Sequence, residues 1–243
     1  MTGSSRGIGA SIAKAFANQG ARVVLHGRDA AALAGVQSEI EKGGGRAIQL
    51  QADLTQFSEI EAMRHQIEAR FGFVEILVAN AGGSFTKPGP IEQITEDGWR
   101  ASVENNLSAT FLTLKSFLPG MKERKTGNII TVSSAAARRA HPASPIPYAA
   151  AKAGIQILTQ QVASQVGPFQ IRVNCVAPET ILTEGNLRRI PEAQQTAFVE
   201  LHPIRRLGTP DDVAQAAVFL ASDAAAWITG VILDVTGGAV MAI

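Results

Sequence analysis

The chain has little of several residue types, and each shortage excludes a class of protein. Its 243 residues include one cysteine, Cys175, so no internal disulfide can form. Charged residues are 18% of the chain and the formal net charge is +1, which gives no strong field to attract nucleic acid or a membrane surface. No apolar run is long enough to span a bilayer, and the first residues lack the apolar block of a signal peptide. We therefore expect a cytoplasmic protein that binds neither nucleic acid nor membranes.

Two kinds of segment alternate along the chain. Short β-branched or aliphatic runs predict strands at 23–25, 48–50, 76–78, 129–132, 171–173 and 232–235. The stretches between them carry apolar residues at helical spacing. Asp29 and Thr55 are predicted to cap helices, and the glycines at 43–45 are predicted to end one. The alternation predicts an α/β fold, one domain over residues 1–243, with a parallel sheet covered by helices on both faces.

A glycine cluster, Gly3, Gly7 and Gly9, opens the chain. Glycines let the backbone approach a pyrophosphate, and a helix beginning near Ile8 points its positive end at the phosphates. A tight turn without a ligand is the other interpretation. A loop of this kind normally follows a strand. Because only one residue precedes Thr2, we expect the central first strand to be missing from this sequence.

The residues after the strand predicted at 23–25 indicate which dinucleotide binds. Arg28 lies there, and Arg6 lies in the glycine loop. Two guanidiniums favour the 2′-phosphate of NADP(H) over NAD(H), because arginine binds phosphate through several donors. Asp29 is assigned to the helix cap and not to a ribose. We predict that NADPH binds at least about ten-fold tighter than NADH, or ~1.4 kcal/mol.

The only tyrosine, Tyr148, lies four residues before Lys152, so both side chains share one helix face. An ammonium ~4 Å from a phenol can lower the phenol pKa by about 3 units, which makes it a proton donor and acceptor without a metal. Taken alone, the pair can also be interpreted as a surface tyrosine with a lysine beside it by chance. The Ser133-Ser134 pair, after the strand predicted at 129–132, supplies a hydroxyl nearby.

Several motifs occur in a characteristic order. They are Thr2-Gly3-x3-Gly7-Ile8-Gly9, Asn80-Ala81-Gly82, Asn106, Ser134, Tyr148-x3-Lys152 and Asn174-x3-Pro178. Over essentially its whole length the chain resembles the classical branch of short-chain dehydrogenases/reductases, which includes 3-oxoacyl-acyl-carrier-protein reductases. The resemblance implies a single Rossmann domain with a doubly wound parallel sheet, assembled as a homotetramer or homodimer.

The resemblance also implies roles for four catalytic residues. Tyr148 matches the general acid that protonates a carbonyl oxygen, and Ser134 matches the hydroxyl that holds this oxygen. Lys152 matches the group that lowers the tyrosine pKa and binds the nicotinamide ribose, and Asn106 matches the asparagine that positions a water. The predicted cofactor contacts, besides Tyr148 and Lys152, are Gly3, Ser5, Arg6, Gly7, Ile8, Gly9, Arg28, Asp53, Leu54, Asn80, Ala81, Gly82, Pro178, Ile181 and Thr183.

The substrate side is less determined. Residues from about 179 to 209 form the least regular region, predicted to be a substrate lid. Glu179 follows Pro178 where the family usually has glycine, so a carboxylate beside the nicotinamide pocket is expected to alter loop shape or substrate choice. Candidates for an apolar pocket are Phe85, Pro145, Ile146, Leu182, Leu187 and Phe198. The basic cluster at 122–125 either attracts an acidic carrier protein or complements a helix C-terminus.

These features favour an NADPH-dependent carbonyl reductase that acts on a 3-oxoacyl thioester or a similar ketone, free or bound to acyl carrier protein. An NAD(P)-dependent alcohol or sugar dehydrogenase of the same family is the alternative. A non-catalytic cofactor-binding sensor is a second alternative. The complete set of Tyr148, Lys152, Ser134 and Asn106 argues against a sensor, which does not need proton-transfer groups.

Overall fold

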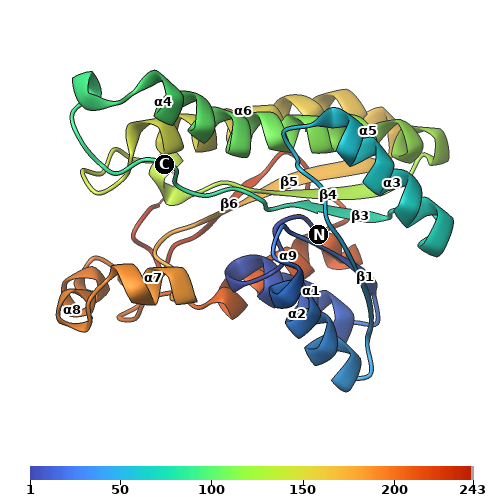
Figure 1. Ribbon diagram of the computed structural model, residues 1–243, viewed down its shortest axis with the longest axis horizontal. Coiled ribbons are helices and arrows are strands. Elements are labelled where there is room, and N and C mark those ends of the chain that lie inside the picture. The colour runs from blue at the N-terminus through green and yellow to red at the C-terminus, as the bar shows by residue number, and fades with distance from the viewer. Residues whose placement is uncertain (242–243) are drawn as a thin grey trace.

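In the computed structural model, which describes residues 1–241 apart from the side chains at 189, 192 and 194, helices lie on both sides of parallel strands (Figure 1). The strands are β1 (Arg22–His26), β2 (Arg46–Leu50), β3 (Ile76–Ala79), β4 (Gly127–Val132), β5 (Ile171–Pro178) and β6 (Ile232–Val235). Each of the six segments predicted as a strand lies within one of them. The predicted doubly wound α/β fold is thereby confirmed.

The helices form two layers. One face is covered by α1 (Gly7–Asn18), α2 (Ala30–Lys42) and α9 (Pro210–Ala221), and the other by α3 (Phe57–Phe71), α5 (Ala109–Arg124) and α6 (Ile146–Val166). The helix α4 (Glu96–Val103) runs into α5 through a π-helical turn (Glu104–Ser108). Short 3-10 turns occur at Ile91–Gln93, Ala135–Ala137, Gly167–Phe169 and Asp223–Ala225.

Hydrogen bonding divides the parallel strands into two groups. β1 pairs with β2, and β3, β4, β5 and β6 pair in that order. Residues 1–4 lie between the groups: the Thr2 N–H donates to the Val78 carbonyl at 2.9 Å, and the Ser4 N–H donates to the His26 carbonyl at 2.8 Å. Among the described residues no strand pairs with both β1 and β3.

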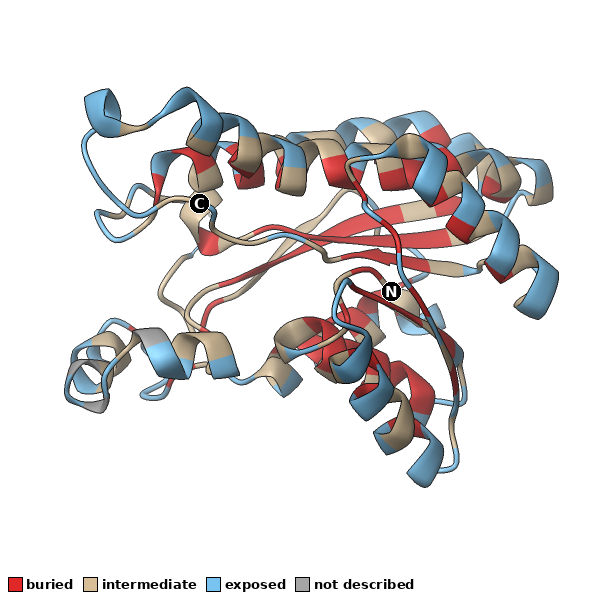
Figure 2. Ribbon diagram, viewed as in Figure 1, coloured by how far each residue is buried: buried red, intermediate tan, exposed pale blue. Residues whose placement is uncertain are grey.

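Two apolar cores, one on each face of the strands, hold the layers together (Figure 2). Ile12 of α1 and Val213 of α9 are fully buried on one face, and Ile60 of α3 and Leu114 of α5 are buried on the other. Strands covered on both faces need apolar side chains on both, so they read as continuous apolar runs in the sequence. The cores place the carboxyl ends of the strands along a common edge, where the candidate site lies.

One predicted helix cap is confirmed and the other is wrong. The Asp29 carboxylate accepts the Ala32 N–H at 3.0 Å and caps α2, and Gly43 follows the last residue of that helix. Thr55 caps nothing, because α3 begins at Phe57 with Gln56 as its N-cap. The Thr55 hydroxyl instead donates to the Asp53 carboxylate at 2.8 Å. Thr55 therefore closes a local turn, in which Asp53 supplies the acceptor.

The segment between β5 and α9 is more regular than the sequence predicts. It contains α7 (Glu184–Arg189) and α8 (Glu192–Glu200), which lie beside the strand ends (Figure 1). The Thr183 hydroxyl accepts the Asn186 N–H at 3.2 Å and caps α7. Pro191 is the N-cap of α8, Pro203 lies three residues after its end, and Pro210 is the first residue of α9. No helix in the described part of the chain has the length and apolar character required to cross a membrane.

Candidate active site

A single large cleft runs along the carboxyl ends of β1 to β5 and has a volume of about 1270 Å³. This exceeds the roughly 300–1,000 Å³ typical of a pocket for one small ligand, so a dinucleotide and a substrate can lie in it together. Of the predicted site residues, the following line the cleft: Gly3, Ser5, Arg6, Ile8, Gly9, Arg28, Asp53, Leu54, Asn80, Ala81, Gly82, Ser134, Tyr148, Lys152, Pro178, Ile181 and Thr183. Gly7 and Asn106 do not line it. No group of three or more metal-binding side chains occurs among the described residues.

The glycine loop leads into the N-terminus of α1. Gly3 and Gly7 have positive φ angles of 63° and 56°, a backbone conformation that favours glycine. A Cβ on Gly9 would lie 2.0 Å from the Gly3 carbonyl oxygen, so only glycine fits there. The N-cap residue Arg6 makes no side-chain cap on α1. The first N–H groups of α1 therefore remain directed at the cleft, as binding of a pyrophosphate requires.

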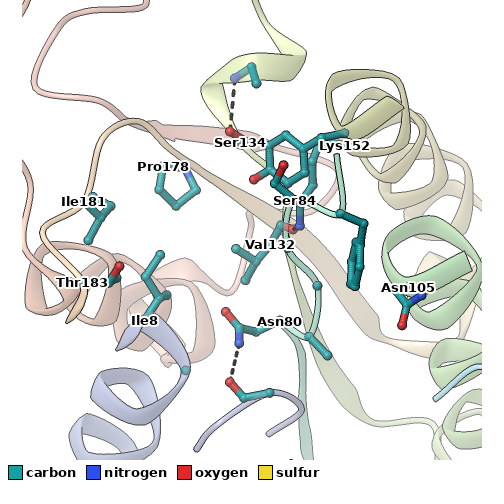
Figure 3. Close-up of a pocket in the computed structure, with 18 of the residues that line it drawn as sticks. Ile8, Asn80, Ser84, Asn105, Val132, Ser134, Lys152, Pro178, Ile181 and Thr183 are labelled. Atoms are coloured by element: carbon teal, nitrogen blue, oxygen red, sulfur yellow. Dashed lines mark hydrogen bonds between the residues drawn. The ribbon is translucent and has the colours of Figure 1, made fainter. Parts of the chain in front are cut away.

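Asn80 holds this loop in place. Its side-chain N–H groups donate to the Gly3 carbonyl at 2.9 Å and the Thr2 carbonyl at 3.1 Å (Figure 3). Its backbone N–H donates to the Thr2 hydroxyl at 3.0 Å. Asn80 thus connects the end of β3 to the glycine loop. Its side-chain N–H groups hydrogen-bond to the loop backbone and so position the loop.

The end of the cleft beside β1 and β2 carries charges of both signs. Arg6 forms an ion pair with Asp29, the residue that we assigned only to a helix cap. The sequence predicted that Arg6 and Arg28 lie here without a neighbouring acid. This prediction is wrong, because the Asp29 carboxylate forms an ion pair with Arg6. Arg28 has no ion pair among the described residues. Hydrogen bonds from Thr55 hold the pKa of Asp53 below its usual value, and Arg28 lowers it further.

At the other end, Ser134, Tyr148 and Lys152 meet at the cleft. Ser134 follows β4, and its hydroxyl accepts the Ala136 N–H at 3.2 Å (Figure 3). The neighbouring Ser133 also lines the cleft, but it is buried and its hydroxyl donates to the Lys152 carbonyl at 2.8 Å. The choice of Ser134 over Ser133 as the hydroxyl that holds a ligand stays a prediction.

Lys152 is only 4% exposed, and its ammonium donates to the Val132 carbonyl at 2.8 Å. Burial lowers the pKa of Lys152 to about 8. The predicted lowering of the Tyr148 pKa is wrong for this structure. Burial raises the pKa of Tyr148, a hydrogen bond from Ser134 opposes the rise, and the negative charge of Glu179 adds to it. Burial of the phenol is the largest cause; the Lys152 Nζ lies 5.7 Å from the centroid of the ring and donates to the Val132 carbonyl.

Asn106 lies in the π-helical turn and is fully buried. Its side-chain N–H groups donate to the carbonyls of Ser102 at 2.8 Å and Gly83 at 2.9 Å, and its side-chain oxygen accepts the Gly83 N–H at 3.1 Å. The side chain thus fastens the loop after β3 to the α4–α5 layer, and the water-positioning role of Asn106 stays a prediction. A π-helical turn has no clear signal in the sequence.

Sequence reasoning missed several lining residues. Asn105, His141 and Asn186 face the cleft, and so does Ile190 at the end of α7. Of the predicted apolar candidates, Phe85, Pro145 and Phe198 line the cleft, whereas Ile146, Leu182 and Leu187 do not. Only the fold decides which residues of a loop face inward, although the position of Asn105 beside Asn106 is a signal that could have been used.

Comparisons with known proteins agree with this site. The family described as enoyl-(acyl carrier protein) reductase matches residues 3–240. The chain is 38% identical to 7alpha-hydroxysteroid dehydrogenase of Escherichia coli over 240 residues, which is 99% of this chain and 92% of that protein. It is 37% identical to 3-oxoacyl-[acyl-carrier-protein] reductase of Vibrio cholerae over 241 residues, 99% of this chain and 96% of that one. The crystal structure of a 3-oxoacyl-[acyl-carrier protein] reductase with bound NAD from Brucella melitensis matches with a TM-score of 0.90 and 35% identity, covering 99% of this chain and 90% of that chain.

The chain therefore belongs to the short-chain dehydrogenase/reductase family, in which it resembles the 3-oxoacyl-acyl-carrier-protein reductases. It is an oxidoreductase of this family and uses a nicotinamide cofactor. The residues fit that cofactor, because the N-terminus of α1 has no side-chain cap and opens onto the cleft at Ile8 and Gly9, as binding of a pyrophosphate requires.

Proposed function

We propose that this protein is an NADPH-dependent carbonyl reductase that reduces a 3-oxoacyl thioester or a similar ketone to the alcohol. The observation that carries the proposal is the meeting of Ser134, Tyr148 and Lys152 in the same cleft as the glycine loop. When bound, the cofactor supplies the hydride. The side chains of this chain then need only hold the carbonyl and deliver one proton.

Each of the three side chains has a step in the reduction. The Ser134 hydroxyl donates to the carbonyl oxygen and orients it. The Tyr148 hydroxyl transfers its proton to that oxygen as negative charge develops there. Lys152 binds the nicotinamide ribose through its ammonium hydrogens and provides positive charge near the phenolate that results. The raised pKa of Tyr148 keeps it protonated at neutral pH, which suits a proton donor and hence the reductive direction.

For the cofactor we propose NADP(H). The support is Arg28, an exposed guanidinium at the cleft that has no ion pair among the described residues. A 2′-phosphate there gains a charge-assisted contact. Asp29, which would repel that phosphate, is balanced by Arg6.

For the substrate we propose an acyl thioester, either free or attached to acyl carrier protein. It would bind in a pocket that includes Phe85, Pro145 and Phe198. The relatives named as 3-oxoacyl-acyl-carrier-protein reductases support this class. The resemblance to 7alpha-hydroxysteroid dehydrogenase and, at 33% identity, to glucose 1-dehydrogenase 2 of Bacillus subtilis favours a second candidate, oxidation of a steroid or sugar alcohol.

We also propose that residues 1–243 form one domain in which the segment 179–209 is a lid over the substrate. Ile190 and Phe198 support this, because both line the cleft from that segment. For the assembly we propose a homotetramer or homodimer that pairs the helices around Asn106 and Tyr148. Phe111 of α5 and Ile157 of α6 support this, being 48% and 54% exposed. Light scattering coupled to size-exclusion chromatography measures the assembly, and a monomer would contradict it.

The test of function is the absorbance of the reduced nicotinamide in the presence of a substrate panel. The panel contains acetoacetyl-CoA, simple ketones, a hydroxysteroid and glucose, each with both cofactors in the matching redox state. We expect turnover of acetoacetyl-CoA with NADPH. Turnover of only the steroid or the sugar would select the second candidate, and cofactor binding without any turnover would select a sensor.

A further inference from the structure

Glu179 is the first residue after β5, at the edge of the sheet where the cleft opens. Its N–H donates to the Val235 carbonyl at 3.2 Å, which fixes its backbone against β6. Three carboxylates line the cleft among the described residues: Asp29, Asp53 and Glu179. Asp29 and Asp53 follow β1 and β2, at the end of the cleft beside Arg6 and Arg28. Glu179 alone stands at the end with Ser134 and Tyr148.

The carboxylate of Glu179 has few hydrogen-bond partners within the protein. The nearest guanidinium nitrogen of Arg139 lies 3.8 Å away, which is too long for a hydrogen bond. The Thr180 hydroxyl is at 3.5 Å, at the outer limit of one. A carboxylate has about four acceptor positions, so Glu179 retains acceptor capacity toward the cleft. Its side chain is 21% exposed, which leaves it reachable by a ligand while limiting competition from water.

Glu179 also lies close to the reacting group. Its charge contributes to the raised pKa of Tyr148, as expected of a carboxylate near the phenol. Ser134, Tyr148 and Glu179 line the same cleft, so a carbonyl compound bound to Tyr148 and Ser134 shares that cleft with the Glu179 carboxylate. An apolar substrate group beside Glu179 would remove water from the carboxylate without replacing its hydrogen bonds. A hydrogen-bond donor in the same place would replace them.

We propose, building on the proposed reductase function, that Glu179 is a specificity-determining residue that accepts a hydrogen bond from a hydroxyl group on the carbon beside the reacting carbonyl. Among the simple ketones that the proposed reductase accepts, hydroxyketones are then preferred. A neutral hydroxyl fits better than an ammonium group, because the Arg139 guanidinium, 3.8 Å away, already places a positive charge beside Glu179. A substrate carboxylate at the same place is repelled.

The test compares matched ketones that differ by one hydroxyl, 2-butanone and 1-hydroxy-2-butanone, with aminoacetone as a cationic probe. Steady-state kcat/KM is measured with NADPH and with NADH for the wild type, Glu179→Ala, Glu179→Gln and the remote control Glu39→Ala. We expect the wild type and Glu39→Ala to prefer the hydroxyketone by about ten-fold or more, mostly through KM. Glu179→Ala brings the ratio close to one, and Glu179→Gln, which keeps a neutral acceptor, gives an intermediate ratio. Cofactor titration and thermal unfolding check that the variants fold.

The outcomes separate this inference from the function on which it rests. If both ketones are reduced equally well and Glu179→Ala leaves their ratio unchanged, the inference is wrong and the reductase function stands. A preference for aminoacetone that Glu179→Ala abolishes also overturns it, since charge and not a hydroxyl would then be recognised. If the wild type reduces no ketone or thioester of either panel, both proposals fail together.

Discussion

The ammonium nitrogen of Lys152 lies 5.7 Å from the centroid of the Tyr148 ring and donates to the Val132 carbonyl at 2.8 Å. The spacing of one helical turn places the two side chains on the same face of α6. The direction of the ammonium is set by its hydrogen bond to Val132, the last residue of β4. Lys152 is therefore held at the floor of the cleft. Its place there suits the binding of a ribose, while the acidity of Tyr148 is set by burial, Ser134 and Glu179.

Replacement of the tyrosine should separate chemistry from binding. In Tyr148→Phe the proton donor is lost while the ring remains, so we expect turnover to fall by about two to four orders of magnitude with an unchanged cofactor dissociation constant. The measurement is kcat from nicotinamide absorbance together with a fluorescence titration of the cofactor. Near-full activity in this variant would end the proposed mechanism.

The charge of Glu179 should appear in the pH profile. The pKa of Tyr148 is raised by burial and further by Glu179, so Glu179→Gln is expected to lower it. Alcohol oxidation needs the phenolate and rises with pH through this pKa, so its profile should move to lower pH in the variant. Ketone reduction needs the phenol, so its decline at high pH should move the same way. The test is kcat/KM against pH in both directions, with Glu39→Ala as the control, and a shift to higher pH would contradict the assignment.

Cofactor choice should depend on Arg28. We expect NADPH to bind at least about ten-fold tighter than NADH, and Arg28→Ala to remove most of this difference by weakening only NADPH. Arg46→Ala is the matched control, because Arg46 is an exposed arginine of β2 that does not line the cleft. Isothermal titration gives the constants. Equal dissociation constants for the two cofactors in the wild type would refute the prediction.

Two glycine-to-alanine changes should have opposite signs. In Gly9→Ala the new Cβ would meet the Gly3 carbonyl at 2.0 Å and the Asn80 amide at 2.7 Å, so we expect a loss of roughly 1–3 kcal/mol in the free energy of unfolding and weaker cofactor binding. Gly35 is an exposed residue within α2 and has no atom within 4 Å of such a Cβ. Gly35→Ala should therefore stabilise the protein by about 0.5–1 kcal/mol. Urea unfolding measures both, and equal effects would show that the contacts at Gly9 do not matter.

Local patterns predicted the fold well where one physical preference acts alone. The strand segments are apolar because both faces of the sheet are covered, and Asp29 caps α2 because a carboxylate satisfies free N–H groups at a helix start. Thr55 has equally suitable chemistry, but the Asp53 carboxylate competes for its hydroxyl. The region from Pro178 to Pro210 has four prolines, yet α7 and α8 form between them. The first error arises because a neighbouring carboxylate competes for the hydroxyl, and the second because the prolines interrupt helices only where they lie.

By itself the sequence determined the order of the strands and helices, the glycine loop and the set of side chains able to move a proton, because these follow from short-range spacing and residue chemistry. Only the tertiary structure decided which of them share the cleft. It withdrew the Asn106 side chain into hydrogen bonds with Gly83 and Ser102, placed Asp29 against Arg6, and brought Glu179 to the end of the cleft with Tyr148. Such pairings join residues far apart in the chain, so burial and charge at the site are fixed by packing and cannot be read from neighbouring positions.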